Sequence, residues 1–503
     1  QTRAPIRAAR PTCNGTPVWR ALTMAQYLGA DLGTQAVKVV VFDTDANKIV
    51  ARASAAVAAP QSPRVGAAEQ SPADWWRAFD LALRHALAQP EVFAGQIRAL
   101  GVAGQQHGLV ALDERLQVLR PAKLWCDVEA AAEARELSAL FGRAVPAGFT
   151  APKILWLHRH EPELAKRLRH VALPHDWLNL QLGGVLATDH GDASGTGLYD
   201  PISGSYEVAA AAQIHADLPA QLLPLLPANA SHSHLLPQWA QQYGLPQDLP
   251  IAVGSGDNMM SALGAGATQA GVWVVSLGTS GTIFGHTPMA VLDPSGCVAP
   301  FRDALGGGLP LVCTQNCTTV VEEARAASGV SHAALTAAAA ALTPSVDSPL
   351  FLPYLNGERT PNWPHASGVL FGLRSGSLLP APLYRAAVEG ASLALALGLQ
   401  HLQTLGLPVQ KLRLVGGGAH NPFWARVLCD LVQQPLEICA EQETAALGAA
   451  LQAQWMENGV HPSSYQPSEY GQALQPDQGL AALYADKLQR FQTLSEKMFG
   501  TSS

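Results

Sequence analysis

The chain has 503 residues, of which 48% are hydrophobic and 14% charged, and its formal net charge is −7. This length predicts two domains rather than one core. The mildly acidic composition predicts neither a nucleic-acid partner nor binding to anionic membranes, and every apolar run is shorter than the roughly 18 residues that span a bilayer. Seven cysteines without regular spacing indicate reduced thiols, as in a cytoplasmic protein.

The first 23 residues differ from the rest of the chain. They contain Arg3, Arg7, Arg10 and Arg20 but no acidic residue and no hydrophobic periodicity, and Met24 follows directly. No apolar stretch suits a secretory signal. The segment is either a basic targeting sequence or an extension ahead of a start at Met24, and we favour a disordered extension over residues 1–23.

A β-hairpin is predicted over residues 27–43, with a third strand after it. Its turn contains Asp31-Leu32-Gly33-Thr34, where glycine lets the backbone approach an oxyanion and N–H groups can converge on a phosphate with the Thr34 hydroxyl. Asp31 would repel a phosphate unless a cation stood between them, so the turn predicts Mg²⁺ held largely through waters. Lys38 on the return strand either reaches a phosphate or is an exposed strand residue.

The next motif follows an apolar strand. A helix begins after Ser71, the strand covers 97–103, and Gly104-Gln105-Gln106-His107-Gly108 comes next. Amide and imidazole groups between glycines suit the hydroxyls of a polyol, because they donate and accept without a full charge. A lone histidine in a turn is otherwise a satisfied hydrogen-bonding group, and His107 could instead serve as a base. We favour substrate binding by Gln106 and His107.

A second polar motif opens a helix after another short strand. Alanine-rich helices are expected around 129–141, and a surface connection over 224–237. The strand at 251–254 then leads into Ser255-Gly256-Asp257-Asn258. A helix dipole favours an ionised carboxylate at this place, and such a group can accept a hydroxyl proton during phosphoryl transfer. Asp257 is either that base or a helix N-cap.

The glycine turn is repeated near the middle of the chain. Ser276-Leu277-Gly278-Thr279-Ser280-Gly281 again joins two apolar strands, which suggests a duplicated ATP clamp with one turn in each half. The switch between the halves is expected between Gly264 and Val272. Alternating strands and helices predict α/β domains with mixed sheets.

A third glycine motif leads into a helix. The strand at 412–415 enters Gly416-Gly417-Gly418, and Asn421-Pro422 then gives an N-cap with proline at the first helical position. Such a helix start presents free N–H groups to an anion or nucleotide. Tight packing of helix on strand also requires glycine, but three in a row favour nucleotide binding.

Taken in order over residues 25–495, these motifs resemble the FGGY sugar kinases, which share the actin-like (ribonuclease H-like) ATPase fold. The similarity includes Leu124-Trp125-Cys126-Asp127, Asn356-Gly357-Glu358-Arg359-Thr360-Pro361 and residues 443–450. It implies two actin-like α/β domains with mixed sheets flanked by helices, separated by a deep cleft. Residues 25–268 would bind the sugar and supply the base, and residues 269–495 would bind the nucleotide. The segments at 104–108 and 255–258 are most similar to those of members that act on D-xylulose.

The resemblance also implies residue roles. Asp257 would take the proton from the terminal (5-) hydroxyl of D-xylulose, and Gln106, His107 and Asn258 would hold the sugar. Asp31, with Thr34, would organise Mg²⁺ and the γ-phosphate of ATP. The remaining nucleotide contacts would come from Thr279, Gly281, Gly417, Gly418 and Asn421. A homodimer is also implied. Alternative hypotheses are a kinase for ribulose, gluconate, glycerol or another polyol, an actin-like ATPase that works by binding, and a sugar sensor without catalysis.

Overall fold

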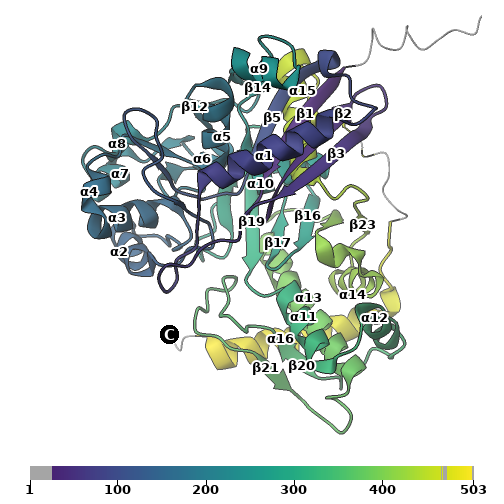
Figure 1. Cartoon of the computed structure of the whole chain (residues 1–503). Helices are drawn as coiled ribbons and strands as arrows, with labels where there is room; N and C mark the ends of the chain where they lie inside the picture. Colours follow the sequence, from purple (N-terminus) through teal and green to yellow (C-terminus); the bar gives the residue numbers. More distant parts are fainter. Residues whose placement is uncertain (1–24, 466, 468–472, 501–503) are drawn as a thin grey trace, which may run out of the picture.

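Two mixed β-sheets of similar design organise the protein, whose computed structural model describes residues 25–465, 467 and 473–500 (Figure 1). The extension predicted over residues 1–23 lies outside the described residues. The first sheet runs through β13 (Ser231–His234), β14 (Pro250–Ala252), β5 (Ile97–Gly104), β1 (Gln26–Leu32), β2 (Ala36–Asp43) and β3 (Lys48–Ala56). The short strand β15 (Ser255–Gly256) pairs with β5 beyond the end of β14. The second sheet runs through β18 (Ala299–Arg302), β19 (Gly308–Thr314), β17 (Gly281–Phe284), β16 (Val272–Leu277), β22 (Lys411–Val415) and β23 (Leu436–Ile438).

Each sheet is built around a hairpin with a parallel neighbour. β1 pairs antiparallel with β2 and parallel with β5, and β16 pairs antiparallel with β17 and parallel with β22. Both hairpins were predicted from the glycine turns. Val39, Val40 and Val41 of β2 are all buried, as expected for a strand covered on both faces. The prediction of a duplicated mixed α/β architecture is confirmed.

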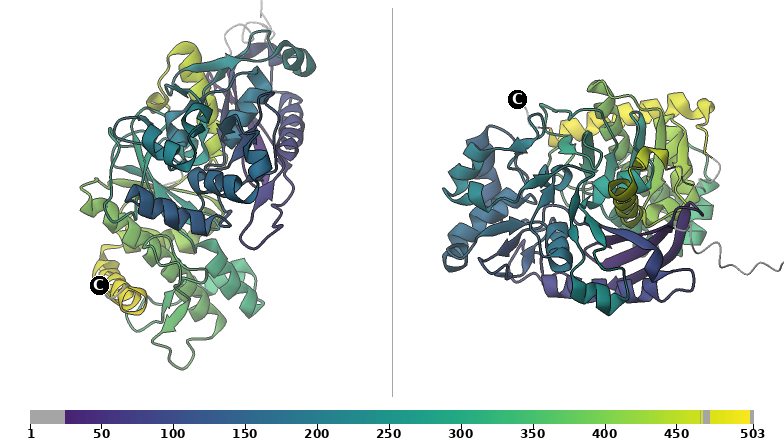
Figure 2. Two further views of the ribbon diagram at one scale, coloured as in Figure 1. Left: turned by 90° about the vertical axis from the view of Figure 1, so that its left-hand side faces the viewer. Right: turned by 90° about the horizontal axis from the view of Figure 1, so that it is seen from above.

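Helices cover both sheets and form two lobes (Figure 2, left). The longer ones are α1 (Pro72–Leu87), α2 (Ala131–Phe141), α3 (Thr150–His160), α5 (Pro174–Gly183), α10 (Asp257–Gly264), α11 (Thr318–Ser328), α12 (His332–Ala340), α13 (Pro380–Thr404), α14 (Pro422–Val432), α15 (Thr444–Asn458) and α16 (Ala481–Phe499). The shorter helices are α4 (Pro162–Ala165), α6 (His190–Ala193), α7 (Val208–Ile214), α8 (Leu218–Gln221) and α9 (Pro237–Tyr243). The remaining short strands are β4 (Glu69–Gln70), β6 (Val110–Leu112), β7 (Ala122–Lys123), β8 (His170–Ala172), β9 (Thr188–Asp189), β10 (Tyr199–Asp200), β11 (Ser205–Tyr206), β12 (Leu225–Leu226), β20 (Leu350–Leu352) and β21 (Val369–Phe371). Within the described ranges, none of these helices is both long and apolar enough to cross a membrane.

Helix α15 lies on the first sheet although it is distant from that sheet in sequence (Figure 1). A Cβ atom on Gly29 would lie 1.9 Å from the carbonyl oxygen of Ala446, and one on Gly101 would lie 2.1 Å from that of Ala449. Glycine on β1 and β5 therefore allows the helix backbone to touch the sheet. α15 also packs against α10 in the same manner, so that its first residues lie between the two sheets.

Two local predictions need correction. The connection over 224–237 contains β12 and β13, because β13 adds an edge strand to the first sheet beside β14. Ser71 occupies the N-cap position of α1, but its side chain makes no capping hydrogen bond. Proline at the first helical position and the burial of Trp75, Phe79 and Leu83 define this helix instead.

Candidate active site

Strand pairing brings the predicted catalytic residues to one edge of the first sheet. Asp31 on β1 and Ser255 on β15 flank the same residue of β5, Ala103, from opposite sides. The loop carrying Gln106 and His107 begins where β5 ends, and Asp257 follows β15 directly. Because these strands are parallel, their carboxyl ends place all these groups together, the usual position of a site in an open α/β sheet.

A cavity of about 220 Å³ opens at this edge and is lined by both halves of the chain. Its lining consists of Asp31, Lys38, Asp257, Asn258 and Ser261 from the first half and Ser276, Phe284, Val415, Gly416, Gln442, Glu443, Thr444 and Ala445 from the second half. Polar groups dominate this lining, and oxygen-bearing side chains face it from several elements. The cavity therefore suits a charged, polar ligand such as the phosphates of a nucleotide.

Asp31 and Asp257 face this cavity, as does Glu443, which is paired with Lys38. Burial foremost, and then the negative charges of Asp31 and Asp192, raise the pKa of Asp257 to about 8 against hydrogen bonds from Asn258. Burial also raises the pKa of Asp31 to about 6, although the Lys38 ammonium opposes this shift. Repulsion between two buried carboxylates favours a cation near them. Gly256 is the N-cap residue of α10 and Asp257 its first helical residue, so the N-cap interpretation of Asp257 is wrong.

Lys38 is bound to an acidic residue from the other half of the chain. Its Nζ lies 2.7 Å from Oε2 of Glu443, the residue immediately before α15. The Lys38 side chain is 36% exposed and lines the cavity. The ion pair thus joins the return strand of the first hairpin to the start of α15 beside the two carboxylates.

A chain of hydrogen bonds connects the base candidate to the polar loop. The Asn258 amide Nδ2 lies 3.0 Å from Oδ1 of Asp257 and donates across 2.8 Å to Oε1 of Gln106. The backbone N–H of Asn258 also donates to Oδ1 of Asp257 across 2.7 Å. Among the described residues, no group partners the buried Nε2 of Gln106, which leaves this N–H group to donate to a ligand. The three side chains therefore form one array that can both donate and accept.

His107 is held in a fixed orientation by groups that sequence analysis did not identify. Its φ angle is +64°, a conformation that non-glycine residues rarely adopt, and its carbonyl oxygen accepts a hydrogen bond of 2.8 Å from Nζ of Lys153. Nδ1 lies 2.8 Å from the carbonyl oxygen of Gly195, and the ring stacks on Phe149. Burial and the positive charges of Lys153 and Arg359 lower the pKa of His107 to about 3. The ring is therefore neutral, and with Nδ1 donating to Gly195, Nε2 is an acceptor.

Thr34 contacts Gln105 and Trp125 and does not line this cavity. Its hydroxyl donates to Oε1 of Gln105 across 2.7 Å and accepts from the indole of Trp125 across 3.1 Å. This places Thr34, which was predicted among the nucleotide contacts, within a hydrogen-bond network of the first half.

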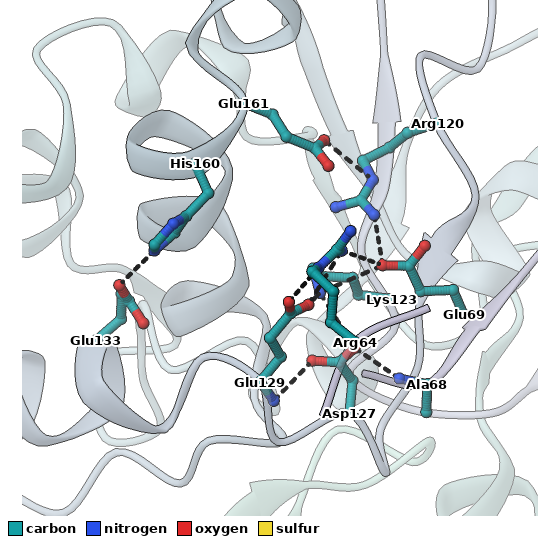
Figure 3. A network of polar contacts seen from close by, with 10 residues as sticks. All are labelled: Arg64, Ala68, Glu69, Arg120, Lys123, Asp127, Glu129, Glu133, His160 and Glu161. Atoms are coloured by element: carbon teal, nitrogen blue, oxygen red, sulfur yellow. Dashed lines mark hydrogen bonds and ion pairs between the residues drawn. The ribbon is translucent and has the colours of Figure 1, made fainter. Parts of the chain in front are cut away.

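A buried ion cluster fixes the Trp125 segment (Figure 3). The Lys123 ammonium is completely buried and lies 3.1 Å from Asp127, 2.5 Å from Glu129 and 3.4 Å from Glu69. The Lys123 ammonium therefore lies among three carboxylates, those of Glu69, Asp127 and Glu129, that could otherwise hold a metal ion. Asp127 also accepts from the backbone N–H of Ala68 across 2.8 Å. The N-cap of α2 is Ala130, so Asp127 does not cap that helix.

A larger cavity, of about 1210 Å³, lies beside the third glycine motif. Gly417, Gly418 and Asn421 all line it, together with apolar and polar side chains of α11, α12, α13 and α14. Asn421 caps α14 as predicted, since its Oδ1 accepts from the N–H groups of Phe423 and Trp424. A Cβ on Gly418 would lie 2.7 Å from Cβ of Leu277, whereas one on Gly417 would meet nothing within 4 Å. Close packing against Leu277 thus accounts for glycine at position 418. The backbone of Gly417 is unobstructed and lines the cavity.

The second glycine turn is arranged differently from the first. Gly281 is buried, and a Cβ there would lie 2.7 Å from Oγ1 of Thr314. Thr279 is exposed, and its carbonyl oxygen accepts from the backbone N–H of Cys317 at the start of α11. Within the described part of the chain, neither Thr279 nor Gly281 lines the two cavities. Ser276 from the preceding strand does.

Comparison with known proteins agrees with this architecture. The N-terminal domain model of the FGGY family of carbohydrate kinases matches residues 26–264, and the C-terminal domain model of that family matches residues 273–457. The chain therefore belongs to the FGGY family of carbohydrate kinases. It is an ATP-dependent sugar kinase, with a small-molecule sugar and ATP as its substrates.

Individual relatives cover most of both chains. A xylulose kinase of Streptomyces coelicolor is 40% identical over 441 residues, covering 85% of this chain and 87% of the relative. A xylulose kinase of Escherichia coli is 36% identical, covering 85% and 89%. The crystal structure of a xylulose kinase from Rhodospirillum rubrum superposes with a TM-score of 0.86 at 27% identity, covering 94% of this chain and 99% of that one.

Proposed function

We propose that the chain transfers the γ-phosphoryl group of ATP to the terminal (5-) hydroxyl of D-xylulose. The similarity to xylulose kinases supports this substrate. The observation that carries the proposal is the Asp257–Asn258–Gln106 array, which places a carboxylate next to neutral donors and acceptors. His107, with a neutral ring, belongs to the same loop as Gln106. Gluconate is disfavoured, because these side chains bring no positive charge for its carboxylate.

The reaction requires positioning and proton removal from the sugar. In this proposal Gln106, His107 and Asn258 hold the sugar hydroxyls, and Asp257 accepts the proton of the attacking hydroxyl. Asn258 fixes the rotamer of Asp257 through two hydrogen bonds to Oδ1, so that one oxygen is held and the other can face the sugar. A base near neutral pKa is suited to this role, because it is ionised in part and returns the proton readily.

Mg²⁺ fits the groups that face the smaller cavity. Asp31 and Asp257 supply carboxylate oxygens, the ligand type that Mg²⁺ prefers, and the negative charge of Asp31 adds to burial in raising the pKa of Asp257, so a cation near the two carboxylates would be stabilised. We assign Asp31 as the residue that holds the ion, largely through waters. When bound, the ion would neutralise charge on the phosphates of ATP. Lys38, which lines the same cavity, completes the phosphate side of this assignment. Thr34 stays a predicted phosphate contact, although its hydroxyl is bound to Gln105 and Trp125 in this structure.

The nucleotide is assigned to the larger cavity and the glycine turns. Gly417, Gly418 and Asn421 line that cavity, and α14 begins there with its positive dipole end. Thr279 and Gly281 of the second glycine turn line neither cavity, and they stay predicted contacts of the nucleotide. The proposed division places sugar binding and the base in residues 25–268 and nucleotide binding in residues 269–495.

The cysteines in the described ranges are free thiols, which supports a cytoplasmic location. The proposed homodimer can be examined by light scattering.

ADP release with Mg-ATP tests the proposal across a panel of D-xylulose, D-ribulose, L-ribulose, glycerol, gluconate and no sugar. Strong stimulation by D-xylulose alone is the expected result. Preference for another polyol would overturn the substrate and keep the kinase. Turnover that ignores every sugar would instead support an actin-like ATPase. An Asp257→Asn variant in the same panel separates sugar-dependent turnover from contaminating ATPase activity.

A further inference from the structure

His175 is a buried imidazole surrounded by carboxylates beside the sugar loop. Its Nδ1 lies 2.7 Å from Oδ2 of Asp192, and its Nε2 lies 3.0 Å from Oδ1 of Asp176 and 3.9 Å from Oδ1 of Asp189. All four side chains are at most 1% exposed. Among the described residues Nε2 makes no hydrogen bond, but the negative charges of the carboxylates on both sides of the ring favour the imidazolium. Burial alone lowers the pKa of His175, but the carboxylates outweigh it and raise the value to about 9.

The backbone and the ring of His175 each lie against one of the segments that form the proposed sugar site. A Cβ on Gly104, where the loop begins, would lie 2.9 Å from the backbone nitrogen of His175. A Cβ on Gly254, just before β15, would lie 2.9 Å from Cδ2 of the His175 ring. The start of α5 therefore packs directly on the ends of β5 and β14.

Two of the aspartates around His175, Asp189 and Asp192, connect it to the segment of the proposed base and to His107. Asp189 accepts a hydrogen bond of 2.7 Å from the hydroxyl of Ser255, two residues before Asp257. Asp192 lies on the four-residue helix α6, and its carbonyl oxygen accepts from the N–H of Gly195 across 3.0 Å. The carbonyl oxygen of Gly195 in turn faces Nδ1 of His107. One imidazolium thus connects both sides of the sugar site.

We propose that the His175–Asp192 ion pair is a positioning pair, which holds the α6 segment so that Gly195 orients the His107 ring toward the sugar. This inference rests on the proposed function, in which His107 binds the sugar. A helix of four residues has little stability of its own, so its place depends on tertiary contacts such as this pair. Neither His175 nor Asp192 touches substrate in this scheme. Loss of the pair weakens sugar binding and leaves the nucleotide side unchanged.

Steady-state kinetics of four variants tests the pair. His175→Gln and Asp192→Asn each remove one charge with little change in volume, their combination removes both, and His175→Lys keeps a cation. We expect each single variant to raise the KM for the sugar by about 10- to 100-fold while the KM for ATP stays within about twofold. The double variant should lose no more than the worse single variant, and His175→Lys should recover most of the loss.

The control is His401→Gln, because His401 of the second half also pairs with a buried aspartate, its Nε2 lying 2.9 Å from Oδ2 of Asp293, and lines neither of the two cavities. It should leave both KM values unchanged. An unchanged sugar KM in folded His175→Gln or Asp192→Asn overturns the proposal, and so does an equal rise in both KM values. If His175→Gln does not fold, Asp192→Asn and the double variant decide. The sugar used is the one that stimulates the wild-type chain most, so preference for another sugar overturns the D-xylulose assignment and leaves this comparison valid.

Discussion

The side-chain amide of Asn258 donates a hydrogen bond of 2.8 Å to Oε1 of Gln106, which joins the start of α10 to the loop that follows β5. The two residues are 152 positions apart in the chain. Because Nδ2 of Asn258 also lies 3.0 Å from Oδ1 of Asp257, the orientation of this carboxylate, the proposed base, depends on the position of the loop that carries Gln106. A sugar that moves Gln106 therefore also acts on the carboxylate.

A double-mutant cycle measures this dependence. We expect Gln106→Ala and Asn258→Ala each to lower kcat/KM for the sugar, and the double variant to lose less than the sum. The coupling free energy should be about 0.5–3 kcal/mol, the range found for residues in one hydrogen-bond network. Additive losses would show that the two side chains act separately.

Replacing the proposed base should separate catalysis from stability. Asp257→Asn keeps the shape and the hydrogen bond with Asn258 but cannot accept the hydroxyl proton, so kcat should fall by about 10²- to 10⁴-fold. The thermal midpoint should not fall, because the variant removes a carboxylate whose ionised form is disfavoured by burial and by Asp31. Near-normal turnover in the folded variant would contradict the assignment of Asp257.

Replacing Asp31 should change the metal requirement. With Asp31→Asn, half-maximal activity should need at least about tenfold more Mg²⁺, because one negative ligand is lost. The measurement is ADP release against total Mg²⁺ at constant ATP. Lys38→Met serves as the comparison, since it alters the same cavity lining without removing a carboxylate. An unchanged Mg²⁺ dependence would indicate a structural role for Asp31.

Local sequence patterns predicted the strands, turns and helix starts. The contacts that orient the side chains of the site could not be predicted, because they join residues far apart in the sequence. Glycine turns between apolar strands identified both hairpins, and the Asn-Pro pair identified the N-cap of α14, because these patterns act over a few residues. Lys153 and Gly195, which hold His107, lie 46 and 88 positions away from it and belong to no local pattern. The pairing of Asp127 with Lys123 on β7 likewise depends on how the strand is placed, and no local pattern indicates it.

The buried Lys153 ammonium should make stability depend on pH. Burial lowers the pKa of Lys153 from 10.5 to about 7, although Asp127 opposes this shift. Between these values the unfolded chain holds a proton that the folded chain has lost, so the stability contributed by this group is fully present above pH 10.5 and is lost as pH falls to about 7. The free energy of unfolding of the wild-type chain, relative to Lys153→Met, should rise by up to about 1.4 kcal/mol per unit between pH 7 and 9. Urea titrations at pH 7, 8 and 9 measure this, and parallel curves for the two proteins would refute it.

The contact between α10 and α15 should tolerate an added methyl group poorly. A Cβ on Gly448 would lie 1.9 Å from the carbonyl oxygen of Met260, and one on Gly264 would lie 1.9 Å from that of Thr444. Since both obstacles are backbone atoms of helices, the helices must separate, and Gly448→Ala should cost at least about 1–3 kcal/mol of unfolding free energy. Gly95→Ala is the matched control, because a Cβ there meets nothing within 4 Å.

Separation of the two helices would also move Glu443, at the start of α15, away from Lys38, so the KM for ATP should rise together with the loss of stability. A Gly448→Ala variant as stable as Gly95→Ala would show that the two helices are not held at backbone contact.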